Sequence, residues 1–374
     1  MRAIVPSLQA ELVPLPPLAE LETAWRDLES RADGAFFLSW SWTGTWLALL
    51  PKAVHPRLVV VRNDDRVVGL AVACDRTVKR RLFRSRGRFL NSTGDVELDE
   101  LTIEYNGILA ERGLEAAVAS AGLEALRQPP RWDEIDIPGC HGEDPLREVK
   151  AKGLRREEWR ARAARHVDLD LVRAGGGDYL AQLDRGVRQK VRKSLRDFEA
   201  VGPVRFERAS TPEQAAAFFG DLRRLHGLAW QSRGHEGSFS NAFFTRFHET
   251  LVRERFASGE IALQRLTAGD HVLGCLYSFD YRGCLYQYQS GFDLDASRGS
   301  GWRPGLVSHV LAIGQALEEG RRRYDFLAGD QRYKEELGNA GGTMHWLRYQ
   351  RPRLKLAIER GARSLVRRVK RKPK

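Results

Sequence analysis

Cysteine and long hydrophobic segments are scarce in this 374-residue sequence. No stretch approaches the roughly 18–20 uninterrupted apolar residues that a membrane-spanning helix needs. The first twenty residues also lack the sustained apolar segment of a signal peptide. Because hydrophobic residues still make up 42% of the chain, we expect packed cores in a cytoplasmic protein. The length favours two domains over one.

Neither disulfide nor metal chemistry is indicated. None of the four cysteines belongs to a Cys-x-x-Cys pair or lies beside a histidine at metal-ligand spacing; they are Cys74, Cys140, Cys275 and Cys284. A hairpin that turns near residues 280–283 would place Cys284 opposite residue 279 and not opposite Cys275. We therefore expect reduced thiols and no metal. No Ser-His-Asp order and no Walker loop appears either.

Positive charge is concentrated at the C-terminal end. Residues 351–374 hold eleven basic residues and one acid, Glu359, which is a net charge of +10 out of +12 for the whole chain. The first 350 residues are therefore nearly neutral, which argues against a nucleic-acid-binding body. The basic tail could contact anionic lipid at the inner face of the membrane, nucleic acid or an anionic cofactor. A frayed, solubilising terminus explains it equally well.

The order of predicted elements occurs twice along the chain. Each half reads as two helices, three antiparallel strands, a helix and a further strand. In the first half we expect helices at 18–31, 40–50 and 114–127 and strands at 57–61, 66–74, 88–90, 101–109 and 132–137. In the second half we expect a helix after the cap Thr211, helices at 241–257, 305–319 and 331–337, and strands at 261–267, 271–280, 284–291, 324–328 and 343–350.

Two strand pairs strengthen the comparison between the halves. The segments LVVVRNDDRVVGLAVACD and IALQRLTAGDHVLGCLYSFD share a strand, an acidic turn and a strand with a central glycine, Gly69 or Gly274. We predict an α/β protein with two domains, each a mixed, mostly antiparallel sheet flanked by helices. The predicted ranges are 1–174, a basic interdomain helix at 175–202, a domain at 203–350 and the tail at 351–374.

Several segments of the second half suggest a family. They are DRGVRQKVRKSLRDFEAVG, LHGLAWQSRGHEGSF and PGLVSHVLAIGQALEEGRRRYDFLAGDQRYKEELG. In order and spacing they resemble the FemAB-like tandem proteins of the GNAT superfamily, which are grouped with cellulose-biosynthesis (CelD-type) acetyltransferases. The resemblance implies an N- or O-acyltransferase with acetyl-CoA or another acyl-CoA as co-substrate. It also implies a small-molecule or glycan-precursor acceptor from the cell envelope or an exopolysaccharide.

Two rival functions remain open. Some relatives are thought to use aminoacyl-tRNA as donor for a peptidoglycan precursor, and only such a donor would make nucleic acid a partner. Alternatively, the chain is a non-catalytic scaffold that docks through its basic tail. The first rival predicts RNA binding, and the second predicts that substitutions at the catalytic candidates have no effect on function.

The donor would bind at the glycine-rich loop SRGSGWRPGL, where backbone N–H groups at a helix start can hold a pyrophosphate. The residues assigned to it are Arg298, Gly299, Gly301, Arg303 and Gly305. The loop departs from the usual GNAT pattern, since Arg303 stands where glycine or alanine is expected. An ordinary flexible loop before a helix is the alternative. The first half has no such loop, so we expect a degenerate donor site there and a contribution of acceptor contacts or structure only. Substitution of Gly107 or Arg112 should then not affect donor binding.

The catalytic candidates follow the strand at 324–328. The resemblance implies that this strand splays away from the strand at 284–291 to admit the thioester arm. Lys334 would then stabilise the oxyanion, Asp325 or Asp330 would accept a proton or hold the acceptor, and Tyr333 would pair with Lys334. The alternatives are that Asp330 caps the short helix and that Lys334 lies on its solvated face.

Further contacts to substrate are predicted on neighbouring elements. His226 could serve as general base or acceptor contact, beside Trp230 and Arg233. Tyr286 and Tyr288 alternate on one strand face and could line the cleft, although core packing explains them equally well. On the basic helix, Arg188 could bind an anionic donor or acceptor, or belong to a solvated face.

Overall fold

The computed structural model describes residues 8–80, 83–294, 299 and 301–370. The chain divides into two compact units. Unit 1 comprises Met1–Ala161 and Met344–Lys374, and unit 2 comprises Arg162–Thr343. This division differs from the predicted ranges, because it places residues 344–350 and the basic tail with the first unit and the basic helix within the second.

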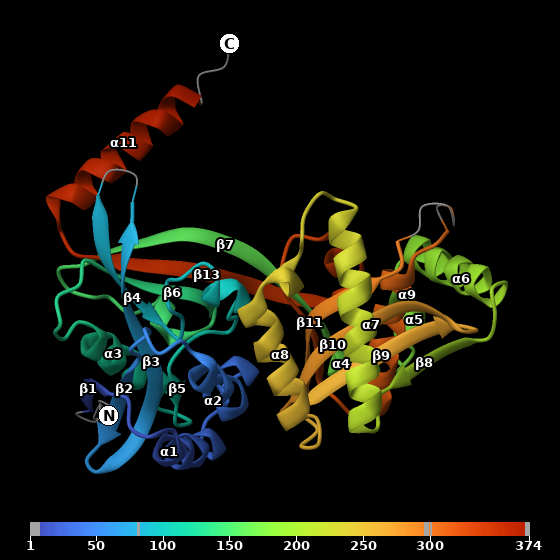
Figure 1. The fold of residues 1–374 in the computed structure, drawn as a ribbon, viewed down its shortest axis with the longest axis horizontal. Coiled ribbons are helices and arrows are strands. Elements are labelled where there is room, and N and C mark those ends of the chain that lie inside the picture. The colour runs from blue at the N-terminus through green and yellow to red at the C-terminus, as the bar shows by residue number, and fades with distance from the viewer. Residues whose placement is uncertain (1–7, 81–82, 295–298, 300, 371–374) are drawn as a thin grey trace. The chain divides into compact units, whose positions relative to one another are not determined.

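Unit 1 contains an antiparallel run of strands that continues into a parallel pair (Figure 1). Its strands follow the order β1-β2-β3-β4-β6-β13, with β4 and β6 parallel and β5 paired to β3. The elements are β1 (Gln9–Pro14), α1 (Leu18–Ser30), α2 (Trp40–Leu49), β2 (Arg57–Asn63), β3 (Arg66–Lys79), β4 (Arg84–Leu90), β5 (Leu109–Ala110), α3 (Glu115–Leu126), β6 (Glu134–His141) and α11 (Leu354–Lys370), with short 3₁₀ turns at 36–38, 98–101 and 145–147.

Unit 2 repeats the same order. Its strands are arranged β7-β12-β11-β10-β9-β8, with β11 and β12 parallel. The elements are α4 (Leu169–Ala174), α5 (Tyr179–Gln182), α6 (Arg185–Glu199), β8 (Val204–Arg208), α7 (Pro212–Gln231), α8 (Ala242–Arg255), β9 (Ile261–Ala268), β10 (His271–Tyr281), β11 (Cys284–Phe292), α9 (Pro304–Glu318), β12 (Arg323–Ala328) and α10 (Arg332–Leu337), with a 3₁₀ turn at 238–240. The predicted fold class is confirmed, since both units are mixed, mostly antiparallel sheets flanked by helices.

The units differ from a simple tandem arrangement in their last strands. The strand that follows β6 is β7 (Arg155–Asp168), yet β6 pairs with β13 (Ala340–Gln350). In turn, β12 pairs with β7 in antiparallel register, from Arg323↔Asp168 to Ala328↔Ala164. Each unit is therefore completed by the strand that follows the other unit's parallel pair. Sequence order alone predicts the opposite assignment, since neighbouring elements usually pair.

The sheet of unit 2 separates two apolar layers. Alternation along β10 sends Leu276 into the core formed with α6 and α9, whereas Tyr277 and Phe279 pack with the aromatic residues of the α7 and α8 face. The other predicted helices begin within one residue of their predicted starts, whereas the basic helix predicted at 175–202 spans only Arg185–Glu199. Thr211 Oγ1 accepts the N–H of Gln214 at 3.2 Å, which is the predicted cap of α7.

The central glycines predicted to match do so in space. A Cβ at Gly69 would lie 2.5 Å from Val118 Cγ1 of α3, and one at Gly274 would lie 2.9 Å from Ser308 Oγ of α9. Both glycines let the helix that follows the splayed strand approach the sheet closely. The match supports the interpretation of the two halves as one repeated plan.

Some sequence-based expectations were wrong. The strand predicted at 101–109 is mostly loop, with only Leu109–Ala110 paired. Strands β1, β7 and β8 were not predicted. The β10–β11 turn is tighter than expected, so Cys284 lies opposite Tyr281 and Cys275 opposite Gly291. The expectation of reduced thiols is consistent with this register, because all four cysteines are free and buried.

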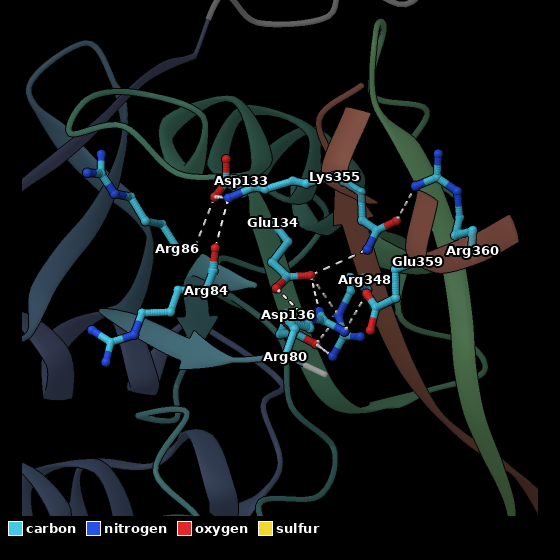
Figure 2. Close-up of polar contacts among 11 residues, drawn as sticks. Arg80, Arg84, Arg86, Asp133, Glu134, Asp136, Arg348, Lys355, Glu359 and Arg360 are labelled. Carbon is cyan, nitrogen blue, oxygen red and sulfur yellow. Dashed lines mark hydrogen bonds and ion pairs between the residues drawn. The ribbon is translucent and has the colours of Figure 1, made fainter. Parts of the chain in front are cut away.

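The basic tail, which belongs to unit 1, is helical over residues 354–370 and not frayed there; this helix is α11. Lys355 of α11 points to Asp133 (Figure 2), and its Nζ lies 2.5 Å from Asp133 Oδ2. Arg360 Nη1 donates to Gln350 Oε1 at 3.0 Å. Glu359 pairs with Arg80 at 3.6 Å. Leu356 is fully buried. None of the helices in the described ranges is long and apolar enough to cross a membrane.

Candidate active site

The parallel strands of unit 2 separate after three pairs. The register runs Cys284↔Arg323, Leu285↔Tyr324 and Tyr286↔Asp325, and then the ladder ends although β11 continues to Phe292. This is the predicted splay. Where neighbouring strands diverge, main-chain groups of their facing edges leave the ladder and become available to an extended ligand. The parallel ladder between β11 and β12 therefore ends at Tyr286 and Asp325, and main-chain edges beyond this point do not pair with each other.

Asp325 closes the base of this splay. Its side chain is completely buried, and its Oδ1 accepts the N–H of Leu327 at 2.8 Å. Leu327 has a φ of 60°, and the ladder with β7 slips between Asp325 and Ala328. A bulky residue in the left-handed region is strained and persists only where its surroundings hold it. Asp325 thus fixes a bulge at the end of β12.

Lys334, on α10, forms hydrogen bonds with the same end of β12. Its Nζ donates to the carbonyl oxygens of Phe326 at 2.7 Å and Ala328 at 2.8 Å, and lies 3.4 Å from that of Leu327. The residue is only 5% exposed. The expectation that it lies on a solvated helix face is therefore wrong. An ammonium group that donates to several main-chain carbonyls holds the bulge and adds positive potential at the splay.

Asp330 lies exposed just beyond this bulge. The N-cap of α10 is Gln331, and no side-chain cap hydrogen bond forms there. The alternative that Asp330 caps the helix is therefore wrong. Its carboxylate is a solvent-facing group two residues after Ala328, the end of the bulged strand.

Tyr333, the neighbour of Lys334 in sequence, belongs to a stacked aromatic pair. Its partner, His309, was not predicted from the sequence. The ring of His309 on α9 stacks on that of Tyr333 at 4.8 Å with an interplanar angle of 8°. His309 Nδ1 lies 2.9 Å from the hydroxyl of Tyr324. Burial, with a smaller contribution from Lys334, lowers the pKa of His309 to about 3. Burial likewise raises the pKa of Tyr333 well above its usual value, so its phenol stays protonated.

His226 has a defined tautomer. Trp230 Nε1 donates to its Nε2 at 2.9 Å, so the proton of the neutral ring must reside on Nδ1. Burial, and to a lesser degree the charge of Arg233, lowers the pKa of His226 to about 4. Its Nδ1 is buried and has no hydrogen-bond partner within the described part of the chain. His226 is therefore a hydrogen-bond donor at neutral pH and not a general base.

The glycine-rich loop rests on α6. Ser194 Oγ donates to the carbonyl of Gly301 at 2.6 Å, and Trp302 packs edge-on against Phe198 at 4.7 Å. Gly299 has a φ of 82°. Arg298, the first residue assigned to the donor, lies outside the described residues. The loop thus leads directly into the N-terminus of α9, where Pro304 occupies the first turn.

The N-terminus of α9 suits an anion. Its first turn contains no acidic residue, and Arg303 at the N-cap is exposed. A Cβ at Gly305 would lie 3.0 Å from Phe292, so this position keeps the helix start close to the end of β11. The main-chain N–H groups of a long helix start carry partial positive charge. The arrangement is chemically suited to a phosphate-bearing donor.

The remaining predicted residues divide between the site and the fold. Tyr288 belongs to an aromatic cluster with Phe244 and His248, so core packing explains it. Tyr286 stands at the last paired position of β11 and is 8% exposed. Arg188 donates to the carbonyls of Ala181, at 2.8 Å, and of Leu183, which stabilises the turn before α6.

Arg233 is exposed and lies over Trp230 at 5.7 Å. Gly237 explains why this corner is compact, because a Cβ there would lie 2.8 Å from His226 and 2.9 Å from Trp230. In the described ranges no group of three or more His, Cys, Asp and Glu residues is placed to hold a metal ion. His226, Trp230 and Arg233 therefore form one corner of unit 2.

The comparisons agree with this geometry. Residues 185–335 match the family described as acetyltransferase (GNAT) domain. FemX has a similar structure at 13% identity, with a TM-score of 0.55 over 90% of this chain and 96% of that one. L-PGS from Bacillus licheniformis is similar at 14% identity, with a TM-score of 0.54 over 93% and 96%. No curated protein matches significantly.

The chain therefore contains a GNAT-type acetyltransferase domain over residues 185–335. Its two units repeat one GNAT-like plan, and its fold is that of the FemAB-like tandem proteins. The GNAT domain that matches the family lies entirely within unit 2, which also holds the splay, Lys334 and the glycine-rich loop.

Proposed function

We propose that the chain transfers an acyl group from acetyl-CoA or another acyl-CoA to an amine or hydroxyl, with the donor bound in unit 2. One observation carries the proposal. The splay that begins after Tyr286 and Asp325 adjoins an acid-free helix start that is reached through a glycine-rich loop. An extended arm with an anionic head matches both features.

The donor's head would be held by the first turn of α9. Main-chain N–H groups there, Gly305 and the charge of Arg303 would balance a pyrophosphate. Asp197 lies beside Gly301, but its carboxylate is paired with Lys193 at 2.9 Å. The residues present therefore fit a CoA head group. Bound there, acyl-CoA would supply an activated thioester carbonyl.

The chemistry needs an oxyanion stabilised and two protons moved. Lys334 would hold the bulged end of β12 in place and supply positive potential. Tyr333, kept protonated by burial, would donate its proton to the departing thiolate. Asp330, the exposed carboxylate at the strand end, would accept the proton of the acceptor amine or hydroxyl. Asp325 would fix the bulge, and the Nδ1–H of His226 would bind a carbonyl or hydroxyl oxygen.

The acceptor is proposed from the family resemblance alone. FemAB-like and CelD-type relatives point to a cell-envelope or exopolysaccharide precursor, met in the cytoplasm. Donation from aminoacyl-tRNA would require an open basic surface. On α6 part of the charge is already engaged, because Lys190 pairs with Glu336 at 3.0 Å and Lys193 with Asp197. These contacts weigh against RNA as the donor.

α11 is proposed to contact an anionic membrane surface. Its single acid, Glu359, faces Arg80, so the remaining charge of the tail is positive. Leu354 is 78% exposed and Ile358, one turn later, is 55% exposed. Exposed apolar residues one turn apart on a basic helix are typical of helices that lie in a membrane interface.

Vesicle sedimentation tests the membrane contact. The full chain should bind vesicles with phosphatidylglycerol and not vesicles of phosphatidylcholine alone. Ile358→Glu should weaken that binding several-fold, while Leu171→Glu, at an exposed position of unit 2, should not. Equal binding by both variants would exclude α11 as the contact.

Calorimetric titration tests the donor. Acetyl-CoA and longer acyl-CoAs should bind saturably, and Arg298→Ala and Arg303→Ala should each weaken binding about tenfold, as loss of a charge-assisted contact does. Arg112→Ala is the matched control in unit 1, where Arg112 Nε donates to Asp33 at 2.7 Å. Absence of heat with every acyl-CoA would refute the proposal and favour the tRNA-linked donor or the scaffold.

A further inference from the structure

A cavity of about 260 Å³ lies in unit 1, at the place equivalent to the splay of unit 2. The parallel strands β4 and β6 pair only over Gly87↔Glu134, Arg88↔Ile135 and Phe89↔Asp136. Beyond the last pair the strands diverge, and both Phe89 and Asp136 line the cavity. Acceptor contacts or a structural role were expected for this half of the chain, but no local pattern in β4 or β6 indicates which residues would line a site.

Aromatic faces form most of the wall. Trp42 and Trp46 come from α2 and Trp346 from β13, and each is at least 94% buried. Trp159 of β7 also lines the cavity, yet it is 44% exposed. A large aromatic ring left in solvent beside a concave, aromatic surface is a feature of ligand sites. The wall can therefore cover the faces of a flat or ring-shaped molecule.

The polar lining is balanced in charge and held in place. Asp99 accepts the N–H groups of Thr93 at 2.8 Å and Gly94 at 2.7 Å. Arg348 binds Asp136 through Nη2 at 2.7 Å. Arg160 stacks on Trp346 at 4.5 Å. The lining thus contains two carboxylates and two guanidinium groups.

This balance argues against strongly charged ligands. A cation would meet the two guanidinium groups, and an anion would meet the two carboxylates. Both kinds of group can instead serve hydroxyls, since carboxylates accept hydrogen bonds and guanidinium groups donate them. The lining therefore suits a neutral ligand that carries several hydroxyls.

The loop beside the cavity is strained. Thr102, which lines the cavity, has a φ of 31°. For a β-branched residue this value is a true outlier, and such strain concentrates at sites where a ligand is bound. The loop is therefore held in an unfavourable conformation at the wall of the cavity.

The cavity does not suit CoA. The helix after this splay is α3, whose first turn contains Glu115, and the N–H of Gly113 is already taken by Glu115 Oε1 at 3.0 Å. An acid at a helix start disfavours a phosphate there. Unit 1 therefore keeps the diverging strands but has lost the anion-binding helix start that unit 2 retains.

We propose that this cavity is a second small-molecule site, for a neutral hydroxylated ring the size of one sugar unit. The C–H faces of such a ring would pack against Trp159 and Trp346, and its hydroxyls would donate to Asp99 and Asp136. To call this ligand the acyl acceptor rests on the proposed function, but its binding does not. The diverging strands of unit 1 would then bind an uncharged ring, whereas the equivalent strands of unit 2 would bind an acyl arm.

Saturation-transfer NMR on the full chain tests the site. The probes are methyl glucoside and N-acetylglucosamine as neutral rings, choline as an organic cation and CoA as an anion. A neutral ring should bind, and Trp159→Ala should weaken it tenfold or more without unfolding, because the side chain is half-exposed. Trp346→Phe should weaken it less, since a smaller ring still stacks. Val96→Ala, at an exposed position of the neighbouring loop, is the control and should leave binding unchanged.

The outcomes separate this proposal from the donor proposal. Binding of choline or CoA at this cavity, binding of no neutral ring, or ring binding that is unchanged in Trp159→Ala would overturn the second site. Acyl-CoA titration of the same samples reports on unit 2 independently. A protein that binds a ring but no acyl-CoA would retain the second site and lose the proposed donor.

Discussion

Both units have a buried aspartate where their parallel strands begin to diverge, but the two aspartates make different contacts. Asp136 and Asp325 each occupy the last paired position of the second parallel strand, and both are buried. Asp136 is neutralised by Arg348, which reaches it from β13 at 2.7 Å. Asp325 instead accepts the N–H of Leu327 and shapes a bulge. One position therefore serves an ion pair in unit 1 and a strained strand end in unit 2.

The helix starts differ in the same sense. In unit 2 the first turn of α9 has no acid and follows a glycine-rich loop, whereas Glu115 occupies the first turn of α3. A repeated plan thus retains its strand geometry, while a helix start without an acid, as an anion would require, is present in one copy only. What separates the copies is charge at a few positions, and each prediction below changes one such position or its surroundings.

As pH falls, unit 2 should lose folding stability before unit 1 does. Burial lowers the pKa of His226 to about 4 and those of His248 and His309 to about 3. The unfolded chain takes up these protons near pH 6.5 and the folded chain does not, so stability is lost as pH falls below 6.5. The loss is roughly 2 kcal/mol per histidine by pH 5. Burial raises the pKa of Asp144 in unit 1 to about 6, which stabilises the fold as pH falls.

Hydrogen exchange at pH 7.5 and 5.0 measures this difference. Amides of β10 and α9 should lose protection at the lower pH, and those of β2 and β3 should lose much less. Unit 1 also contains Glu134. Burial raises the pKa of this carboxyl group, but its contacts with cationic groups, Arg80 first among them, hold the pKa below its usual value. Protonation of Glu134 therefore affects stability only below about pH 4.5, which is outside the range between pH 7.5 and 5.0. Equal loss in both units would contradict the prediction.

Neutralising the two aspartates should have unequal consequences. Asp136→Asn removes the carboxylate that Arg348 binds at 2.7 Å and leaves this buried guanidinium group beside Glu134, at 3.5 Å, so it should destabilise the protein by about 3 kcal/mol or more. Asp325→Asn keeps an oxygen for the N–H of Leu327, so it should preserve the bulge, cost less stability and lower acyl transfer only a few-fold. Urea denaturation and release of free CoA thiol measure the two effects. Similar profiles for both variants would refute the distinction between the splays.

Removing the charge of Lys334 should act on the strand end. Lys334→Met preserves most of the side-chain volume but leaves the carbonyls of Phe326 and Ala328 without their donor. We expect kcat to fall about 100-fold, equivalent to roughly 2.7 kcal/mol. Since its ammonium group is engaged in the fold, Lys334→Arg should not restore full activity. Wild-type kcat in Lys334→Met, measured by thiol release, would exclude this residue from the site.

Sequence reasoning was most accurate where local signals were strong. The strands β9, β10 and β11 were predicted within about one residue, because turns with glycine and acidic residues separate them in the sequence. By contrast, β7 reads RREEWRARAARHVD, and its many charged residues hide a strand that is largely solvated on one face. Its pairing with β12 depends on tertiary packing that no local pattern encodes.

The candidate site was only partly predictable for the same reason. The splay and the importance of Asp325 and Lys334 came from the family resemblance. The contacts of Lys334 depend on a bulge at Leu327 that no propensity indicates. His309 was missed because it sits on an apolar helix face, where a buried histidine resembles any core residue. The cavity of unit 1 is built by α2, β4, β6, β7 and β13, which are distant in sequence.

The smallest expected effect concerns the two central glycines. A methyl group at Gly69 would press on Val118, and one at Gly274 would press on Phe292 and Ser308. Each substitution by alanine should destabilise the protein by about 1–2 kcal/mol through overpacking. Only Gly274→Ala should also weaken acyl-CoA binding, by a few-fold, because α9 and the end of β11 hold the proposed donor. If Gly69→Ala weakened acyl-CoA binding equally in calorimetry, the donor site could not be confined to unit 2.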